Sequence, residues 1–305
     1  MDTLRIATRK SPLALWQAHF IADKIKELHP VRVELVPMLT SGDKFQKDKL
    51  QAVGGKGLFV KELEQAILDK QADIAVHSMK DVPATFPQGL CLPIIGKRHN
   101  PADALISRSH CKLQQLPQQA IIGTTSLRRQ SQLLAIRPDL IVKPLRGNVN
   151  TRLEKLHNGK YDAIILAYAG LERLGMKEHV CEILSDEIML PACGQGALGI
   201  ECRTEDTALH QLLASLNDPL SALCVQTERH VNALLGGNCH VPLAVYCKPQ
   251  PHEQLLLRAR VMNMDGTVMI EDSQQDHQSQ AMRLADNCAQ TLLSKGAGKL
   301  LCQTS

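Results

Sequence analysis

The sequence predicts two α/β domains followed by a smaller α+β domain. Strand and helix patterns alternate from Leu4 onward, and the alternation starts again near Asp103. Strands that alternate with helices are typical of parallel sheets covered by helices. From about Leu220 the strands are grouped between two helices, which favours an antiparallel sheet. A length of 305 residues suits two or three such domains, at about 150 residues per domain.

Each of the first two blocks is expected to contain three strands. Ser11 offers an N-cap and Pro12 a first-turn proline, so a helix should begin there. In the first block we expect strands over 4–7, 31–38 and 72–77, and helices over 12–28 and 58–70. In the second block we expect strands over 120–123, 140–143 and 161–166, and helices over 126–136, 151–157 and a short one ending at 171.

The third block should form a three-stranded antiparallel sheet flanked by helices. Helices are expected over 220–235 and 277–293, and strands over 241–247, 254–263 and 268–270. Asp265-Gly266 stands between the last two strands and is a strong hairpin signal.

Composition and charge exclude several classes of protein. Hydrophobic residues make up 44% and charged residues 22% of the chain, as in ordinary globular proteins. No apolar run approaches the ~18 residues that span a bilayer, and residues 1–10 lack the apolar stretch of a secretory signal. A net charge of +4 and 3% aromatic residues do not favour nucleic-acid binding. We therefore expect a cytoplasmic protein that binds neither membrane nor nucleic acid.

The ten cysteines give no local sign of a metal site. No two of them have the C-x-x-C spacing of zinc ribbons or thioredoxin-like motifs. Ten cysteines without a secretory signal fit a reducing compartment, and most are expected to be small buried hydrophobes.

Arginines at the starts of helices are the strongest sign of a ligand. Arg128 and Arg129 fall in the first turn of an expected helix, directly after a strand. Cations are unfavourable there, because the helix N-terminus already carries positive partial charge. A bound anion would remove this conflict, and Thr124, Ser126 and backbone N–H groups would help to hold it.

Three more arginines repeat this arrangement. Arg146 and Arg152 stand between a strand and a helix, and Arg9 follows the first strand. Ligands of open α/β sheets bind beyond the carboxyl ends of the strands, so all five arginines would converge on one cleft. Any one of them alone is usually a solvated surface residue, but for the repeated pattern we favour an anion site. Arginine suits bidentate binding of carboxylate or phosphate.

Two other residues allow two interpretations each. Asp81 follows the strand at 72–77 and would lie at the same rim as the arginines. Its spacing favours an ion pair with Lys80, although it would equally accept N–H bonds or stabilise a developing cation. Cys239 stands on a glycine-rich loop beside His240, where a thiol is accessible, but a lone loop cysteine is more often incidental.

Two glycine-rich segments resemble nucleotide motifs only in part. Residues 194–199 match G-x-G-x-x-G, but Pro191 precedes them and residues 200–203 have a strand pattern, so we favour a flexible crossing between blocks. Residues 53–57 lack the Gly-Lys-Ser/Thr ending of a phosphate loop. They form either a mobile glycine loop or a lid with Lys56 facing an anion.

Six segments, in the same order along the chain, resemble the hydroxymethylbilane synthases, also called porphobilinogen deaminases. The most specific are His77-Ser-Met-Lys-Asp-Val-Pro83 and Ser126-Leu-Arg-Arg129. The others are residues 7–18, 54–63, 145–148 and 237–242. The resemblance covers essentially the whole chain.

The resemblance implies a three-domain fold. Domains 1–96 and 102–190 would be similar to the lobes of type II periplasmic binding proteins, and domain 219–305 would carry the cofactor cysteine. The chain would cross near residues 97–101 and return near 191–196, so that 197–214 belongs to the first domain.

The resemblance also implies a transferase of tetrapyrrole, porphyrin and haem biosynthesis. Such an enzyme joins four porphobilinogen molecules head to tail with loss of ammonia. It then releases the linear tetrapyrrole hydroxymethylbilane to water. The primer is a dipyrromethane cofactor held as a thioether on Cys239. The family needs no metal or nucleotide, and the resemblance suggests a monomer.

Roles for individual residues follow from the same resemblance. Asp81 is the expected catalytic residue, which bonds pyrrole N–H groups and stabilises the positive charge left when ammonia departs. Lys56 and Phe59 would belong to a lid. The cofactor carboxylates would be held by Lys80, Thr124, Ser126, Arg128 and Arg129. The incoming substrate would be bound by Arg9, Ser11, Arg146, Arg152 and Arg173.

Three positions depart from the family pattern. Ala52 stands where many members have lysine, Asn238 where glycine is common, and Tyr168 where a smaller residue is usual.

Two other functions stay open. A binding protein for an anionic small molecule would use the same fold without needing Cys239. A nucleic-acid binder would show salt-sensitive phosphate contacts, although the weak net charge speaks against it.

Overall fold

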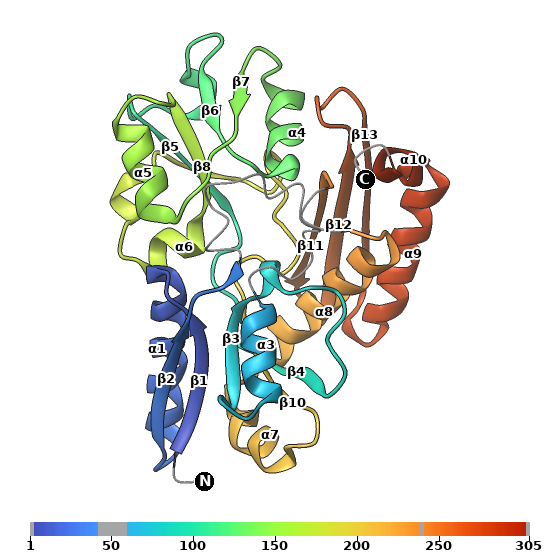
Figure 1. The fold of residues 1–305 in the computed structure, drawn as a ribbon. Coiled ribbons are helices and arrows are strands. Elements are labelled where there is room, and N and C mark those ends of the chain that lie inside the picture. The colour runs from blue at the N-terminus through green and yellow to red at the C-terminus, as the bar shows by residue number, and fades with distance from the viewer. Residues whose placement is uncertain (1–2, 42–59, 238–240, 303–305) are drawn as a thin grey trace. The chain divides into compact units, whose positions relative to one another are not determined.

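The computed structural model describes residues 3–41, 60–237 and 241–302 (Figure 1). The chain divides into two compact units. The first unit comprises residues 1–98 and 197–222, and the second comprises residues 99–196 and 223–305. Residues 42–59 and 238–240 lie outside the described residues, and with them lie the predictions for Ala52, Lys56, Phe59, Asn238 and Cys239.

The first unit contains a five-stranded sheet in the order β2-β1-β3-β10-β4. Its strands are β1 (Thr3–Arg9), β2 (Arg32–Met38), β3 (Ile74–Ser78), β4 (Leu90–Ile95) and β10 (Leu198–Arg203). Its helices are α1 (Pro12–Leu28), α3 (Lys61–Leu68) and α7 (Thr207–Leu213), with 3-10 turns η3 (Met79–Asp81) and η6 (Ala214–Leu216). Helix α8 (Pro219–Leu234) begins in this unit and continues into the second.

Both faces of this sheet are covered, as the alternation of side chains along a strand requires. Ile6 of β1 packs in a cluster with Ile21 and Ile25 of α1. The next residue, Ala7, points to the other face and packs with Ile67 of α3. Strands at the centre of the sheet are therefore buried on two sides, and in β3 the first four of the five residues are buried.

The second unit contains two sheets among its described residues. A five-stranded sheet has the order β7-β6-β8-β5-β9, and a three-stranded antiparallel sheet has the order β11-β12-β13. The first consists of β5 (Asp103–Ser107), β6 (Ile121–Gly123), β7 (Ile141–Lys143), β8 (Ala163–Ala167) and β9 (Glu182–Leu184). It is accompanied by α4 (Leu127–Ile136), α5 (Val149–His157), α6 (Tyr168–Arg173), η4 (Leu113–Gln115) and η5 (Lys177–His179).

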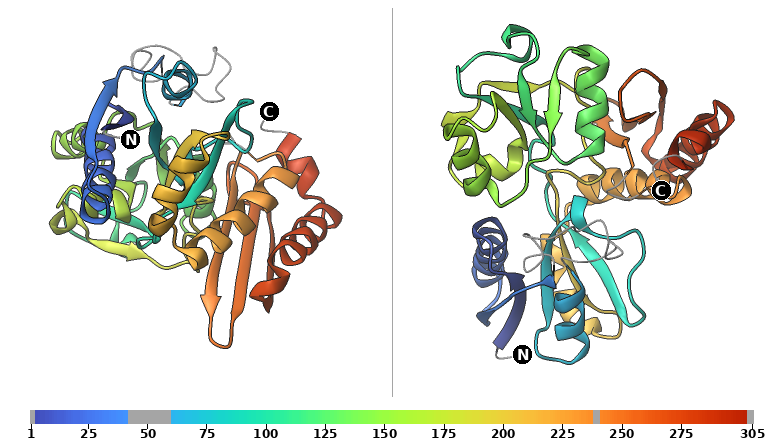
Figure 2. Two further views of the ribbon diagram at one scale, coloured as in Figure 1. Left: turned by 90° about the horizontal axis from the view of Figure 1, so that it is seen from below. Right: turned by 45° about the horizontal axis from the view of Figure 1, so that its top comes forward.

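The antiparallel sheet has one face covered by helices. Its strands are β11 (Leu243–Gln250), β12 (Gln254–Met262) and β13 (Met269–His277), followed by η7 (Gln278–Gln280), α9 (Ala281–Ser294) and α10 (Ala297–Cys302). Figure 2 shows α9 lying along this sheet. Leu284, Cys288 and Leu292 of α9 are buried against Leu255 and Leu257 of β12. None of the helices in the three described ranges is long and apolar enough to cross a membrane.

The two five-stranded sheets share one topology. The fourth strand across the sheet is β10 in the first unit and β5 in the second. Each of these strands is the first one that the chain forms after it passes from the other unit. These two strands run antiparallel to their neighbours. The expected fold class, two α/β sheets with helices on their faces and a three-stranded antiparallel sheet, is confirmed. The expectation of purely parallel sheets is wrong for β10 and β5, because each enters its sheet from the other unit rather than through a local crossover helix.

The third block also differs from expectation at its end. Strand β13 extends to His277, and α9 begins only at Ala281, whereas the sequence pattern placed the strand at 268–270 and the helix from 277. Every residue of β13 has a partner on β12. This long ladder outweighs the polar composition of residues 271–277, which by itself does not favour a strand.

The turn between β12 and β13 gives a test of packing. Gly266 has φ +75°, and a Cβ there would lie 2.4 Å from the Ser131 backbone oxygen and 2.5 Å from the Ala135 nitrogen of α4. Gly175 has a similar φ of +69° with nothing within 4 Å of its would-be Cβ. We expect Gly175→Ala to cost about 1 kcal/mol from backbone strain. Gly266→Ala should cost about 1–3 kcal/mol more, because two backbone segments must separate.

Urea denaturation of both variants, followed by circular dichroism, checks this difference. Equal free energies of unfolding for the two variants would show that the β12–β13 turn does not press on α4.

Candidate active site

The candidate site residues of the first unit stand at one edge of its sheet. Strands β1 and β3 are parallel neighbours, with Ala7 opposite Ala75, so their carboxyl ends lie at the same edge. Arg9 ends β1, and Ser11 follows it as the N-cap of α1, accepting a hydrogen bond from the Ala14 nitrogen at 3.4 Å. Lys80 and Asp81 follow β3 directly, in η3.

Asp81 is exposed, and its carboxylate makes no hydrogen bond or ion pair with any residue that the structure describes. The ion pair with Lys80 that the spacing favoured is therefore not formed. The turn below Asp81 is anchored, because Met79 is buried and its nitrogen donates a hydrogen bond to the Ala197 oxygen at 3.0 Å. An anchored turn that presents a carboxylate with open acceptor positions suits the binding of N–H groups or of a cation.

A buried polar cluster lies under this edge of the sheet. His77 Nε2 of β3 lies 2.8 Å from a carboxylate oxygen of Glu201 on β10, and both side chains are at most 5% exposed. Burial, together with the charge of Glu201, raises the pKa of the nearby Glu64. Buried polar groups of this kind are costly unless they are paired, so the cluster ties β3 firmly to β10. Sequence reasoning missed this cluster, since its members are up to 137 positions apart, counted from Glu64 to Glu201.

The second unit carries its candidate residues at the corresponding edge. Strands β6, β7 and β8 are parallel, so the segments that follow them gather at one edge. Strand β6 is followed by Thr124, Ser126, Arg128 and Arg129, and β7 is followed by Arg146 and Arg152. Strand β8 is followed by α6, which ends at Arg173. Strand β5 runs antiparallel to β8, with Asp103 opposite Ala167, so the start of β5 lies at this same edge.

Arg128 and Arg129 are buried and share one carboxylate. An Arg128 Nη1 lies 2.8 Å from one oxygen of Asp103, and Arg129 donates from Nε and Nη2 to the other at 3.1 and 2.7 Å. The same Nη1 of Arg128 also donates to the Leu190 backbone oxygen at 2.7 Å, and Arg129 donates from Nη1 to the Ile165 backbone oxygen at 3.0 Å. The Asp103 carboxylate thus supplies one of the negative charges that arginines at a helix start require.

The charges of this cluster do not cancel. Asp103 is 0% exposed, and burial by itself would raise its pKa. Arg128 and Arg129 outweigh that effect and hold the pKa of the Asp103 carboxyl well below its usual range. Burial and the neighbouring Arg129 lower the pKa of Arg128 against the opposing effect of Asp103. Two guanidinium groups against one carboxylate leave one net positive charge at the edge of the sheet, at the N-terminus of α4.

The hydroxyl groups before α4 have defined local roles. The Thr124 hydroxyl accepts a hydrogen bond from the Ser126 nitrogen at 3.1 Å, and the Ser126 side chain caps α4 by accepting from the Arg129 nitrogen at 3.5 Å. Each hydroxyl keeps its O–H donor, so both remain able to bind an anion.

The segment after β7 holds its arginines differently. Lys155 donates to the Arg146 backbone oxygen at 2.8 Å, and Arg152 Nε donates to the Gly147 oxygen at 2.8 Å. Asn148 caps α5 by accepting from the Thr151 nitrogen. The half-buried Arg146 guanidinium itself makes no ion pair with the described part of the chain. The loop is therefore well tied while that guanidinium keeps its binding capacity.

Arg173 belongs to the connection at residues 191–196. It is buried, burial lowers its pKa to about 10, and its Nη2 donates to the Gly196 oxygen at 2.7 Å. Gly196 has φ +90°, and a Cβ there would lie 2.6 Å from the His99 oxygen. Gln195 bonds Asp103 at 3.0 Å and the Pro101 oxygen at 2.6 Å. The G-x-G-x-x-G motif thus serves close contact between two stretches of backbone, not nucleotide binding.

Sequence reasoning missed Asp103 and Gln195 as members of the site. Asp103 begins a strand whose five residues are all buried. An acidic residue at the head of such an apolar run signals a buried partner, because an ionised carboxylate is not buried alone. The identity of that partner was not readable.

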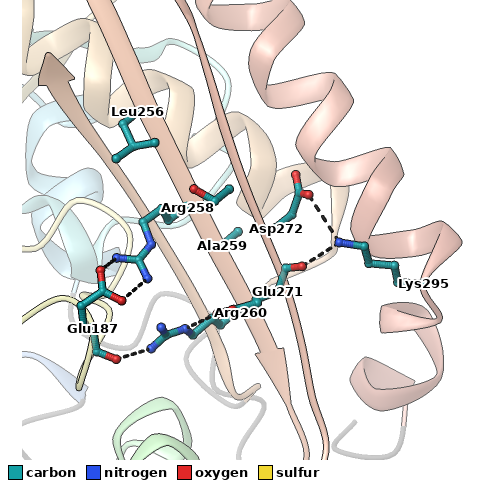
Figure 3. Close-up of a pocket in the computed structure, with 9 residues that line it drawn as sticks. Glu187, Leu256, Arg258, Ala259, Arg260, Glu271, Asp272 and Lys295 are labelled. Atoms are coloured by element: carbon teal, nitrogen blue, oxygen red, sulfur yellow. Dashed lines mark hydrogen bonds and ion pairs between the residues drawn. The ribbon is translucent and has the colours of Figure 1, made fainter. Parts of the chain in front are cut away.

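Figure 3 shows a separate hollow of about 420 Å³ in the second unit. Arg258 pairs with Glu187 through two bonds, and Arg260 donates to the Glu187 backbone oxygen at 3.0 Å. Lys295 lies 3.5 Å from Asp272. None of the predicted site residues lines this hollow. Its charged side chains are paired with one another, so we interpret them as contacts that connect β12 to residue 187, and not as a ligand site.

Each unit thus carries basic and hydroxyl side chains at one edge of its own five-stranded sheet. Comparison with protein families matches residues 4–211 to the model described as porphobilinogen deaminase, dipyromethane cofactor binding domain. Residues 222–294 match the porphobilinogen deaminase C-terminal domain. The chain belongs to the porphobilinogen deaminase family.

Curated relatives agree with this assignment over nearly the full length. The porphobilinogen deaminase of Legionella pneumophila strain Philadelphia 1 is 60% identical over 299 residues, which is 98% of this chain and 97% of that one. The enzyme of strain Paris is 59% identical over the same length and shares. The resemblance drawn from the sequence motifs is thereby confirmed.

Similar solved structures are more distant. The periplasmic VFT2 domain of Bordetella pertussis BvgS has a TM-score of 0.43 at 12% identity, covering 70% of this chain and 85% of that one. A periplasmic binding protein of Salmonella typhimurium with high arginine specificity has a TM-score of 0.40 at 15% identity, covering 73% and 94%. These scores are too low to support any statement about function.

The Asp103 cluster predicts a specific loss of stability. We expect Asp103→Asn to lower the free energy of unfolding by about 3–5 kcal/mol at pH 7, because two buried guanidinium groups lose their charge partner. The pKa of Asp103 is lower in the folded chain than its unfolded value of about 3.9. Its contribution is therefore full above that value and is lost as the pH falls below it.

Urea unfolding at pH 7 and at about pH 3 measures both effects. The variant should lose less stability than the wild type between the two pH values. Asp139→Asn removes the carboxylate of the surface pair with Arg137 and serves as the matched control, with a much smaller effect expected. An Asp103→Asn variant as stable as the control would contradict the role given to the cluster.

Proposed function

We propose that this chain catalyses the hydroxymethylbilane synthase reaction, the stepwise condensation of four porphobilinogen molecules with loss of ammonia, followed by hydrolytic release of the linear tetrapyrrole. The observation that carries the proposal is the buried pair Arg128 and Arg129, which shares the single carboxylate of Asp103. The pair leaves net positive charge at a sheet edge, in a member of the porphobilinogen deaminase family.

The residues of this edge fit the family's dipyrromethane cofactor. Each pyrrole ring of that group carries an acetate and a propionate, and carboxylates are the natural partners of paired guanidinium groups. We assign Arg128 and Arg129, with the O–H groups of Thr124 and Ser126, to hold them, with Lys80 of the first unit. When bound through Cys239, the group supplies the nucleophilic pyrrole carbon to which the next ring is joined.

Substrate carboxylates are assigned to the other basic residues of the two edges. Arg146 offers a guanidinium without an internal ion pair among the described residues, and Ser11 keeps its O–H donor while capping α1. Arg9 and Arg152 stand beside them in sequence and are assigned the same role. Arg173 donates to the Gly196 oxygen at 2.7 Å and is assigned the same role from a buried position.

Asp81 is assigned the central role in the reaction. Its carboxylate is exposed, faces no cation among the described residues and stands on the anchored turn after β3. A carboxylate so placed accepts pyrrole N–H bonds and stabilises the positive charge that develops as ammonia leaves. It also holds and returns protons at its oxygens.

The remaining proposals concern organisation. We propose three domains, residues 1–96 with 197–214, 102–190 and 219–305, which the three sheets support. Lys56 and Phe59 are proposed as lid residues. A monomeric state rests on the family resemblance, and a cytoplasmic location rests on the ten cysteines, which suit a reducing compartment.

Intact mass under denaturing conditions tests the proposed function. Wild-type protein should carry a covalent excess of two porphobilinogen units less two ammonia molecules, and Cys239→Ser should not. Apoprotein would appear without the excess, and incubation with porphobilinogen should then add it. Wild-type protein that gains no mass after incubation would favour the rival function, a non-catalytic binding protein for organic anions.

A second test concerns Asp81. Asp81→Asn should carry the normal cofactor mass but turn over at least about 100-fold more slowly, because an amide cannot neutralise the developing charge. Asp69→Asn, at another exposed carboxylate of the first unit, is the matched control and should keep wild-type turnover. The measurement is steady-state formation of the tetrapyrrole product. Wild-type turnover in Asp81→Asn would remove Asp81 from the mechanism.

A further inference from the structure

Three soft donor groups meet in the first unit, far from the residues assigned to the reaction. They are the thiols of Cys91 on β4 and Cys202 on β10, and the imidazole of His210 on α7. One ligand atom from each lies within 4.8 Å of the other two. Cys91 and Cys202 are direct partners across the antiparallel ladder, while His210 reaches them from the helix that follows β10.

The geometry fits a tetrahedral metal ion. Zinc–sulfur bonds of about 2.3 Å and zinc–nitrogen bonds of about 2.0 Å place the sulfur and nitrogen atoms about 3.5 Å apart. The observed separation of Cys91 Sγ and His210 Nε2 is 3.6 Å. Cys202 is fully buried, whereas Cys91 and His210 are half-buried, so the cluster has both an apolar wall and a side open to solvent.

We propose that Cys91, Cys202 and His210 form a zinc-binding site. Two thiols and one imidazole are a ligand set that selects Zn²⁺ over the hard cations Mg²⁺ and Ca²⁺. The fourth position of the tetrahedron is left to water. Binding converts both thiols to thiolates and releases two protons, so the metal neither gains nor loses electrons.

Zinc binding changes the state of the His210 imidazole. His210 Nε2 lies 3.0 Å from the Arg203 backbone oxygen, so binding through Nε2 moves the ring proton to Nδ1 and gives up that hydrogen bond.

The site lies at the opposite end of the sheet from Asp81. On the ladder between β10 and β3, Leu198 is opposite Ser78 and Cys202 is opposite Ile74. Four residues of strand correspond to roughly 13 Å. Zinc here would join the edge strand β4, its neighbour β10 and helix α7 into one cross-linked unit, and would take no part in the chemistry at Asp81 (Figure 1).

The test is a titration of the full-length, cofactor-loaded, reduced protein with Zn²⁺ by calorimetry and with Co²⁺ by absorption. We expect one ion per chain and a thiolate-to-cobalt charge-transfer band. Cys91→Ser and His210→Gln, both at half-buried positions, should weaken binding at least about 100-fold. Cys111→Ser is the matched control, because the thiols of Cys111 and Cys181 both bond the Ser107 hydroxyl, at 3.6 and 3.8 Å, and no imidazole nitrogen of the described residues bonds either thiol. The control should bind like the wild type.

Three outcomes of the titration would overturn the proposal, and one result of mass measurement would do so as well. They are wild-type protein that binds no zinc, affinity unchanged in both ligand variants, and cobalt binding without the thiolate band, as the cofactor's carboxylates would give. A mass two hydrogens below the reduced value, with Cys91 and Cys202 found linked in the presence of reductant, would also overturn it.

Discussion

Asp103 holds two arginines at a point where neither would otherwise be stable. A guanidinium in the first turn of a helix meets the positive end of the helix dipole, and burial removes the water that would screen it. The carboxylate of Asp103 offsets both costs for Arg128 and Arg129. The connection at residues 195–196, the start of β5 and the start of α4 all depend on this one contact.

The same contact explains how a stable fold presents positive charge. Surface lysines would supply charge without fixed direction, since their long side chains lose entropy when they are held. Here two planar guanidinium groups are fixed by five hydrogen bonds or ion pairs to Asp103, Leu190 and Ile165. One net charge remains unbalanced. In the proposed function, a ligand rich in carboxylates would meet groups that are already in place, which reduces the entropy lost on binding.

The shared topology of the two five-stranded sheets gives each its own buried acid. In each sheet the antiparallel fourth strand brings a carboxylate into the interior, Asp103 on β5 and Glu201 on β10. Asp103 meets arginines and Glu201 meets His77. Strand β10 serves twice in the first unit, because it also contributes Cys202 to the cluster with Cys91 and His210.

Much of this protein was readable from local sequence. Ser11-Pro12 and Ser126 cap helices where the pattern placed helix starts, since capping depends only on neighbouring residues. The motifs around Asp81 and Arg128 pointed to the family and hence to the chemistry. By contrast, the extension of β13 to His277 was not readable, because it depends on pairing with β12.

The sequence by itself determined the alternation of strands and helices, the helix starts at Ser11-Pro12 and Ser126, the basic residues that follow the strands, and the family. Only the tertiary structure decided that β5 and β10 run antiparallel, that Asp103 neutralises part of the arginine pair, and that Cys91 faces Cys202 from 111 positions away. The physical reason is the distance along the sequence over which each interaction acts. Caps and amphipathic patterns act over a few residues, whereas partners across a sheet are set by strand order and register, which no local pattern specifies.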